Sequence, residues 1–343
     1  MVFKGKLTHI FVIKLIVVFS VVALLIAPGR FGNNDGVVHT VQGPVKLDAL
    51  GMTLSHEHLF SNFGLPIDET DSYDETALFA QVIPYLQMLH GQGVRTIFDY
   101  TTSYFGRRAD LLKAMADSTG IRIVTNTGIY GAADDRYVPS YAYDASAEDL
   151  AQRWIAEAEN GIDGTGILPG FIKLAFDEGP VSDIDRKLFE AGLMTHLETG
   201  LSIAVHTGSN PDALKLQLKL LDEHGVHPSA WIWTHANWHD DLELLLDVAD
   251  RGAWVSMDGV NSENIDQYLN YIGRFMEVGL LDRLLISHDG DAYPAGEDIR
   301  PFEAISKELI PAMRSNGFSE SVINQLLVEN PGEAYAIRVR RKK

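Results

Sequence analysis

The chain of 343 residues contains no cysteine, and this absence removes several kinds of chemistry at once. Disulfides, thiolate zinc sites, cysteine nucleophiles and lipid anchors on cysteine are all excluded. Cations are also scarce, because 28 lysines and arginines face 47 aspartates and glutamates, a formal charge of −19. A chain this acidic lacks the clustered cations that a phosphate backbone requires, so nucleic acid is not an expected partner. Any metal must be held by histidine, carboxylate or a modified side chain.

A short apolar run near the N-terminus is typical of a secretory signal. Thirteen residues from Leu15 to Ala27, apolar except for Ser20, follow a start with three lysines and no acid, and Pro-Gly comes next. The run is shorter than the about 20 residues that a membrane span needs. Residues 1–30 are therefore predicted to be a signal peptide that exports the protein to the periplasm or another extracytoplasmic place, with an uncleaved membrane anchor as the alternative. At the other end, the basic tail at 338–343 is predicted to be solvated.

Between these ends, short apolar runs alternate with amphipathic segments, without a low-complexity tract or an internal linker. Continuous apolar runs of this kind are typical of parallel strands that are buried on both faces. Eight runs fit the description: Met52–Ser55, Thr96–Asp99, Ile121–Thr125, Phe171–Leu174, Ser202–Val205, Ala230–Trp233, Ala253–Met257 and Leu284–Ser287.

The amphipathic segments are expected to be helices, and several end at a glycine that suits a left-handed cap. The clearest are Glu75–His90, Ala147–Asn160, Asp183–Glu198, Pro211–His224 and Asp240–Asp250. Eight strands alternating with helices over about 300 residues predict one α/β domain, a (β/α)8 TIM barrel at 37–337. A doubly wound sheet is the competing architecture, but a glycine-rich phosphate turn would normally follow its first strand.

The first predicted strand ends in Ser55-His56-Glu57-His58 instead of such a turn. In extended backbone, residues i and i+2 point to the same side, so His56 and His58 can present two imidazoles to one cation. Imidazole suits zinc-like ions. Two histidines can also be neighbours by chance, so this motif alone leaves the metal site open.

Ligand-type residues also stand on four other predicted strands. Lys173 lies inside a buried run, where an unpaired ammonium is costly, so it is either paired with a carboxylate or altered by a depressed pKa or covalent modification. His206, His235 and Asp289 end strands five, six and eight. Each alone is compatible with a hydrogen-bonded core residue. Together, in a fold whose active sites lie at that rim, they predict a metal site.

At these residues the chain resembles the phosphotriesterase family of the amidohydrolase superfamily. The similarity runs from about Val37 to about Ile337. Five segments carry it: Gly51-Met52-Thr53-Leu54-Ser55-His56-Glu57-His58, Gly93-Val94-Arg95-Thr96-Ile97-Phe98-Asp99, Gly161-Ile162-Asp163-Gly164-Thr165-Gly166, Gly170-Phe171-Ile172-Lys173 and Asn330-Pro331. The resemblance, which extends to phosphotriesterase-like lactonases, implies a barrel hydrolase that forms a homodimer.

The same resemblance implies a site with two divalent ions, most readily zinc. It assigns His56, His58 and Asp289 to a buried ion, and His206 and His235 to a more exposed one. Lys173, carboxylated to N6-carboxylysine, and a hydroxide would bridge the ions, because two cations lower the pKa of a shared water. The hydroxide would attack a carbonyl carbon or a phosphorus atom, and Asp289 would accept its proton.

Two positions depart from the pattern of that family. The aspartate ending strand seven is followed by histidine in its phosphotriesterases and by arginine in its lactonases, whereas Gly259 follows Asp258 here. Trp238 replaces the carboxylate expected three residues after the strand-six histidine. A proton relay away from Asp289 is therefore predicted to be missing, with Asp291 either a replacement or a solvated loop acid. Ester, lactone and amide hydrolysis should then exceed aryl phosphotriester hydrolysis, because their leaving groups take the proton directly.

Side chains in the predicted C-terminal loops are expected to contact a small-molecule substrate, although the aromatic ones are also compatible with rim packing. The candidates are Tyr130, Asn237, Trp238, Asp258 and Asn261, with Arg136 in addition. The leading hypothesis is a metal-dependent hydrolase. Three alternatives stay open: an aryl phosphotriesterase proper, a catalytically silent barrel that binds ligands, and an aldolase that forms a Schiff base on Lys173, which leaves the histidines unexplained.

Overall fold

The computed structural model describes residues 36–70 and 72–342. The predicted signal or anchor at residues 1–30 lies outside this part of the chain. The chain forms two units, Met1–Gly32 and Asn33–Lys343, and all described residues belong to the second. In this described part, no helix is both long and apolar enough to cross a membrane.

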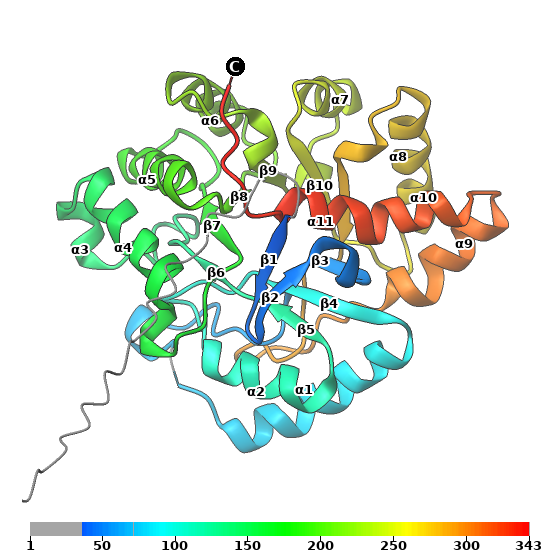
Figure 1. Ribbon diagram of the computed structural model, residues 1–343, viewed down its shortest axis with the longest axis horizontal. Coiled ribbons are helices and arrows are strands. Elements are labelled where there is room, and N and C mark those ends of the chain that lie inside the picture. The colour runs from blue at the N-terminus through cyan, green and yellow to red at the C-terminus, as the bar shows by residue number, and fades with distance from the viewer. Residues whose placement is uncertain (1–35, 71, 343) are drawn as a thin grey trace, which may run out of the picture. The chain divides into compact units, whose positions relative to one another are not determined.

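Two parallel sheets join to form the predicted TIM barrel, which is confirmed (Figure 1). One sheet has the order β11-β10-β9-β8-β7-β6 and the other β12-β3-β4-β5. They join because β5 and β6 are successive segments of one strand position, as are β11 and β12. The bounds are β3 Met52–His58, β4 Val94–Asp99, β5 Arg122–Val124, β6 Asn126–Thr127, β7 Phe171–Ala175, β8 Ser202–His206, β9 Trp231–Thr234, β10 Trp254–Asp258, β11 Leu284–Ser287 and β12 Gly290–Asp291.

The first barrel strand is longer than predicted, because β3 continues through His58 instead of ending at Ser55. Its last residues pair on both sides, with Asp291 of β12 opposite His58 and Asp99 of β4 opposite Glu57. The histidine motif is therefore held inside a hydrogen-bonded ladder, which restricts the directions in which the two imidazoles can point.

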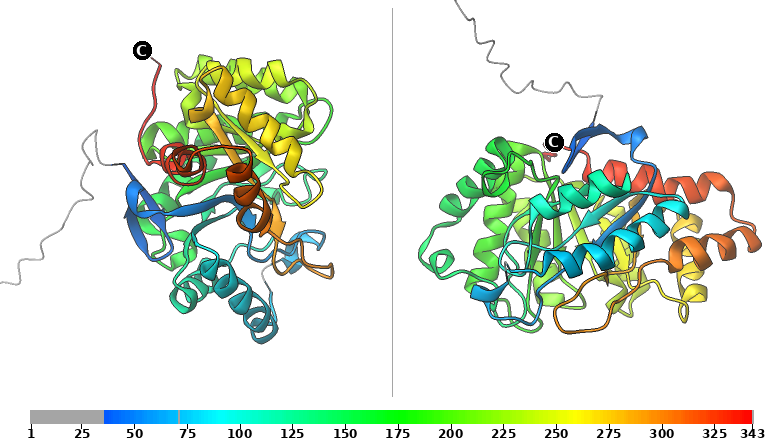
Figure 2. Two further views of the ribbon diagram at one scale, coloured as in Figure 1. Left: turned by 90° about the vertical axis from the view of Figure 1, so that its right-hand side faces the viewer. Right: turned by 90° about the horizontal axis from the view of Figure 1, so that it is seen from below.

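Helices surround the barrel (Figures 1 and 2). They are α1 Glu75–Gly91, α2 Ala109–Thr119, α3 Ser140–Asp144, α4 Ala147–Asn160, α5 Asp183–Thr199, α6 Pro211–Glu223, α7 Leu242–Asp250, α8 Ile265–Glu277, α9 Ile310–Ser315, α10 Glu320–Asn324 and α11 Asn330–Tyr335. The five helices named from the sequence are confirmed. Local signals set their ends: Ser146 and Asp149 form a capping box before α4, and Gly200 ends α5 with a φ of 78°.

The interior of the barrel is filled by aromatic side chains below the C-terminal rim. The rings of Phe98 and Tyr335 lie 3.9 Å apart, and those of Tyr100 and Phe171 lie 4.8 Å apart. Tyr335 also donates a hydrogen bond to the carbonyl of Ser55 at 3.0 Å. This packed layer supports the floor of the rim, because the Tyr100 ring stacks on His56 at 3.8 Å.

The two ends of the described chain pack against the barrel. An antiparallel hairpin, β1 Val37–Thr40 and β2 Gly43–Lys46, comes first, and Val37 accepts a hydrogen bond from the backbone of Ile337 at 2.9 Å. The prediction of a solvated basic tail is wrong for Arg340, which is buried. Its guanidinium donates to Ser202 Oγ at 3.1 Å and to the carbonyl of Glu333 at 2.8 Å. These acceptors offset the cost of burying the charge.

Candidate metal centre

The ends of five barrel strand positions bring potential metal ligands around one cavity of about 190 Å³. All six residues named from the sequence line it: His56 and His58 of β3, Lys173 of β7, His206 of β8, His235 just after β9 and Asp289 between β11 and β12. Parallel strands share one C-terminal rim, so residues far apart in the sequence converge there.

Three of these side chains direct polar atoms at one point. Asp289 Oδ1 lies 3.2 Å from His56 Nε2 and 3.3 Å from His58 Nε2. Thr101 donates its only hydroxyl proton to the carbonyl of Phe60, so His58 Nδ1, 2.9 Å from Thr101 Oγ1, must be the donor of that pair. The lone pair of neutral His58 then lies on Nε2 and faces the Asp289 carboxylate. Two acceptors this close require a shared cation or a proton between them.

His56 shows the same excess of negative charge. Burial alone would lower its pKa, but the carboxylates of Asp258 and Asp289 raise it to about 9. One imidazole therefore lies between two carboxylates, and protonation compensates for their charge. A divalent ion bound by His56, His58 and Asp289 would supply the same compensation, so these residues fit a metal.

A second group consists of Lys173, His206 and His235. The rings of the two histidines lie 4.5 Å apart. Burial lowers the pKa of His206 well below its usual value and that of His235 to about 4, so both imidazoles are neutral and can act as ligands. Within the described residues, the buried Lys173 Nζ has no hydrogen-bond partner, and burial lowers its pKa to about 7. An orphaned amine beside two neutral imidazoles fits a modified lysine that serves as a ligand.

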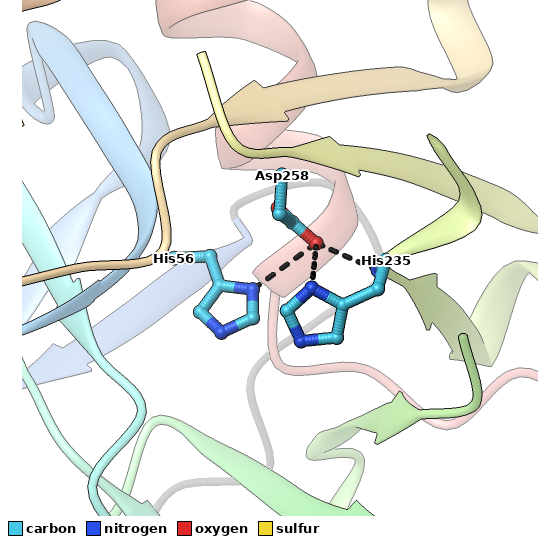
Figure 3. Close-up of side chains that lie close together, drawn as sticks. All are labelled: His56, His235 and Asp258. Carbon is cyan, nitrogen blue, oxygen red and sulfur yellow. Dashed lines mark hydrogen bonds and ion pairs between the residues drawn. The ribbon is translucent and has the colours of Figure 1, made fainter. Parts of the chain in front are cut away.

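Asp258 is placed to orient the histidines (Figure 3). Its Oδ2 lies 3.1 Å from His56 Nδ1 and accepts a hydrogen bond from the backbone N–H of His235 at 2.8 Å. Its Oδ1 accepts from Ser256 Oγ at 2.7 Å. Burial raises the pKa of Asp258, but the neighbouring His56 lowers it by more. The net pKa is about 2, so the carboxylate stays ionised. The contact with Nδ1 turns Nε2 of His56 toward Asp289, the arrangement that outer carboxylates impose on metal-binding histidines.

Replacing Asp258 by asparagine is expected to weaken metal binding about 10- to 100-fold, because the amide no longer orients and polarises His56. Competition with a chromophoric chelator measures this affinity directly. The exposed Asp250 at the end of α7 gives the matched control, Asp250→Asn, which should bind metal like the wild type. An unchanged affinity in Asp258→Asn would show that the carboxylate has no positioning role.

Glu57 is a functional residue that the sequence analysis missed. Its Oε1 accepts hydrogen bonds from Ser287 Oγ and His288 Nδ1, both at 2.7 Å, and its Oε2 accepts from Gly290 N at 2.8 Å. Glu57 therefore holds the turn that carries Asp289. Strand alternation was the available signal, since a residue between two ligands on one strand points away from them.

The side chains predicted to bind substrate divide into two sets. Tyr130 and Trp238 line the cavity, and Trp238 stacks on His235 with ring centres 4.5 Å apart. The cavity lining does not include three others, Asn237, Asp258 and Asn261. The side chains of the two asparagines form hydrogen bonds within the protein. Asn237 Oδ1 accepts from the backbone N–H of Asp258, and Asn261 donates to the carbonyl of Gly259.

Two further expectations need correction. Asp291 is not a solvated loop acid, because β12 pairs with β3 and buries it, and its carboxylate accepts hydrogen bonds from Ser61 Oγ and Tyr293 N. Arg136 does not line the cavity, and its side chain donates to the carbonyl of Gly64 at 3.4 Å. The lining instead includes residues that the sequence analysis did not name: Ser61, Phe63, Phe105 and Arg300.

Comparison with known proteins finds two similar sequences and a similar solved structure, and the names of the three proteins imply different substrates. An aryldialkylphosphatase from Saccharolobus solfataricus is 28% identical over 303 residues, covering 84% of this chain and 95% of that protein. An N-acetyltaurine hydrolase from Salmo salar is 26% identical over 342 residues, covering 87% of this chain and 97% of that protein. A solved structure of a mutated phosphotriesterase-like lactonase from Deinococcus radiodurans has a TM-score of 0.78 at 25% identity, covering 87% of this chain and all of that one.

The chain also matches the sequence model of a whole protein family. A sequence model of the phosphotriesterase family matches residues 36–335, nearly all of the described chain. That span includes every strand of the barrel and all six side chains around the cavity. The chain therefore belongs to the phosphotriesterase family.

Proposed function

We propose that this protein is a binuclear metal-dependent hydrolase that acts on a carboxylic ester, a lactone or an amide. The observation that carries the proposal is the convergence of six potential donor residues around one cavity, among them a buried lysine amine without a hydrogen-bond partner in the described chain. The names of two relatives, a lactonase and an N-acetyltaurine hydrolase, support an acyl substrate.

The donor set suits two zinc ions, because imidazole and carboxylate are ordinary zinc ligands. We assign one ion to His56, His58 and Asp289, and the other to His206 and His235, with Lys173 as a shared ligand. When bound, the ions would lower the pKa of a water molecule and polarise the oxygen of the substrate.

Lys173 would act as a ligand after carboxylation. Its neutral amine adds carbon dioxide, which forms an N–C bond and releases one proton, so that a carbamate anion replaces the amine. Burial favours this reaction, since it lowers the pKa of Lys173 to about 7 and leaves much of the amine neutral at physiological pH. Carboxylation also removes the cost of holding an ammonium in the barrel core.

Asp289 would move the proton during the reaction. Its carboxylate is 30% exposed, and it lines the cavity beside His56 and His58. It would accept a proton from the attacking water and return it to the departing alcohol or amine. Trp238 and Gly259 offer no titratable side chain that would carry this proton elsewhere. A leaving group that needs a proton therefore suits this site better than an aryloxide.

A hydrolysis panel tests the substrate class on metal-loaded protein. We expect kcat/KM for the best lactone, alkyl ester or N-acyl amide to exceed that for an aryl phosphotriester by about tenfold or more, about 1.4 kcal/mol of transition-state stabilisation. The opposite ranking would identify an aryl phosphotriesterase, as in the Saccharolobus relative. Protein that binds two ions and hydrolyses nothing would indicate a silent barrel, and borohydride trapping of a carbonyl substrate on Lys173 would indicate Schiff-base chemistry.

A further inference from the structure

Arg300 is the one arginine among the described residues that line the cavity of the metal centre. A guanidinium carries a positive charge and only donates hydrogen bonds. The backbone is held in place, since Arg300 N donates to the carbonyl of Asp291 and Asp291 N donates to the carbonyl of Arg300, both at 2.9 Å. This bridge closes the loop at 291–300 (orange in Figure 2), so the side chain extends from a fixed point.

No carboxylate of residues 36–70 and 72–342 forms an ion pair with the Arg300 guanidinium, nor does any acceptor there form a hydrogen bond with it. The nearby Asp291 carboxylate is occupied by Ser61 and Tyr293. Asp289, the one acidic residue described in the lining, faces the histidines. Arg300 is exposed, and some other exposed arginines do form ion pairs, as Arg251 does with Asp247 at 2.8 Å. Arg300 acts on the Asp291 carboxylate only through space, without an ion pair, so the N–H donors of its guanidinium stay available to a ligand in the cavity.

Aromatic side chains form another part of the same lining. Phe105 lies edge to face with Tyr130 at 5.2 Å and with Phe63 at 5.8 Å. Phe63 is 44% exposed although it is large and apolar. Such a surface suits the hydrocarbon part of a small substrate. A cavity with an apolar wall and an available guanidinium matches a molecule that has a hydrocarbon body and an anionic end.

We propose that Arg300 determines specificity by binding a carboxylate or sulfonate group of the substrate. The inference rests on the proposed hydrolase function and narrows its substrate to acyl compounds that carry an anion, such as an N-acyl amino acid or an N-acyl aminosulfonate. A guanidinium presents parallel N–H donors that match the oxygens of both groups. The chain as a whole has a charge of −19, and a guanidinium at this rim adds to the local positive potential that attracts an anion.

The test compares substrates of matched size on the metal-loaded full-length protein. N-acetyl-β-alanine and its sulfonate analogue carry the anion, and N-(3-methylbutyl)acetamide replaces it with an uncharged group of similar shape. We expect Arg300→Gln to lower the ratio of kcat/KM for the anionic substrates over the neutral one about tenfold or more. The carboxylate and sulfonate arms show which anion is preferred. Arg136→Gln, at an arginine outside the cavity, should keep the wild-type ratio.

Titration calorimetry with N-acetyl-β-alanine on metal-free protein gives a readout that does not depend on turnover. Arg300→Gln should raise its Kd about tenfold or more, and Arg136→Gln should not. An unchanged ratio and an unchanged Kd in Arg300→Gln would overturn the inference. If neutral esters are hydrolysed without any preference for anions, this inference alone fails. If nothing is hydrolysed but anions bind through Arg300, the proposed function alone fails.

Discussion

Lys173→Ala is expected to lose bound metal and activity together, by more than the roughly 10- to 100-fold that loss of an outer residue costs a metal site. The buried amine has no hydrogen-bond partner within the described chain, so removing it breaks no hydrogen bond, only its contacts with the rings of Tyr100 and Tyr130 at 4.8 and 5.9 Å. What the substitution removes is the proposed shared ligand. Elemental analysis of the purified variant and kcat/KM for the best substrate measure the two losses in parallel.

Short carboxylic acids should partly restore metal and activity in Lys173→Ala, because they place a carboxylate where the carbamate would lie. Lys173→Met gives the control for folding. Its Tm without metal should be no lower than that of the metal-free wild type, since an unpartnered amine is costly to bury. Lys219→Ala, at an exposed residue of α6, should keep full activity. Full activity in Lys173→Ala would refute the carboxylated lysine.

Asp289→Asn is expected to lower kcat by about 100- to 10,000-fold, the range that general acid–base groups contribute. The amide keeps the size of the side chain but has neither the charge that faces His56 and His58 nor a basic oxygen. Metal content separates the two roles. Loss of one ion per chain would reflect the ligand role, and loss of activity with both ions retained would reflect the proton transfer.

The control for this variant lies in the same loop. Asp298 is exposed, so Asp298→Asn removes the same charge from the rim without touching the metal centre. It should keep wild-type kcat and metal content. Wild-type kcat in Asp289→Asn would remove Asp289 from both roles and with it the assignment of the first ion.

The side chains that hold the site in place were largely missed by the sequence analysis. Glu57 stands between two predicted ligands, and Asp258 was assigned to the substrate. In the structure Glu57 contacts Ser287 and His288, beside the predicted ligand Asp289, and Asp258 contacts the predicted ligand His56. Ser287 and His288 are 230 and 231 positions from Glu57, so these contacts depend on which strands lie side by side and in what register. Strands that are buried on both faces are apolar throughout, so their pattern has no alternation that would fix this register.

The structure also differs from the expectations from sequence in the loops and at the C-terminus. Arg340 looked like part of a solvated tail, yet it fills a polar niche beside Ser202 and Glu333. Arg300 carried no motif and reaches the cavity because its backbone pairs with Asp291. In both cases the local sequence around a charged residue in an irregular segment is the same whether the side chain faces solvent or a cavity. Only the path of the segment distinguishes the two.

By itself, the sequence determined the barrel and predicted the six residues that meet around the cavity. Strands buried on both faces must be continuously apolar, and the C-terminal ends of parallel strands must meet at one rim, so both features have a local signature. The tertiary structure alone decided which atoms face one another: the lone pairs directed at Asp289, the orphaned amine of Lys173 and the available charge of Arg300. These depend on side-chain directions and on contacts between segments far apart in the chain, which folding sets and no short stretch of residues encodes.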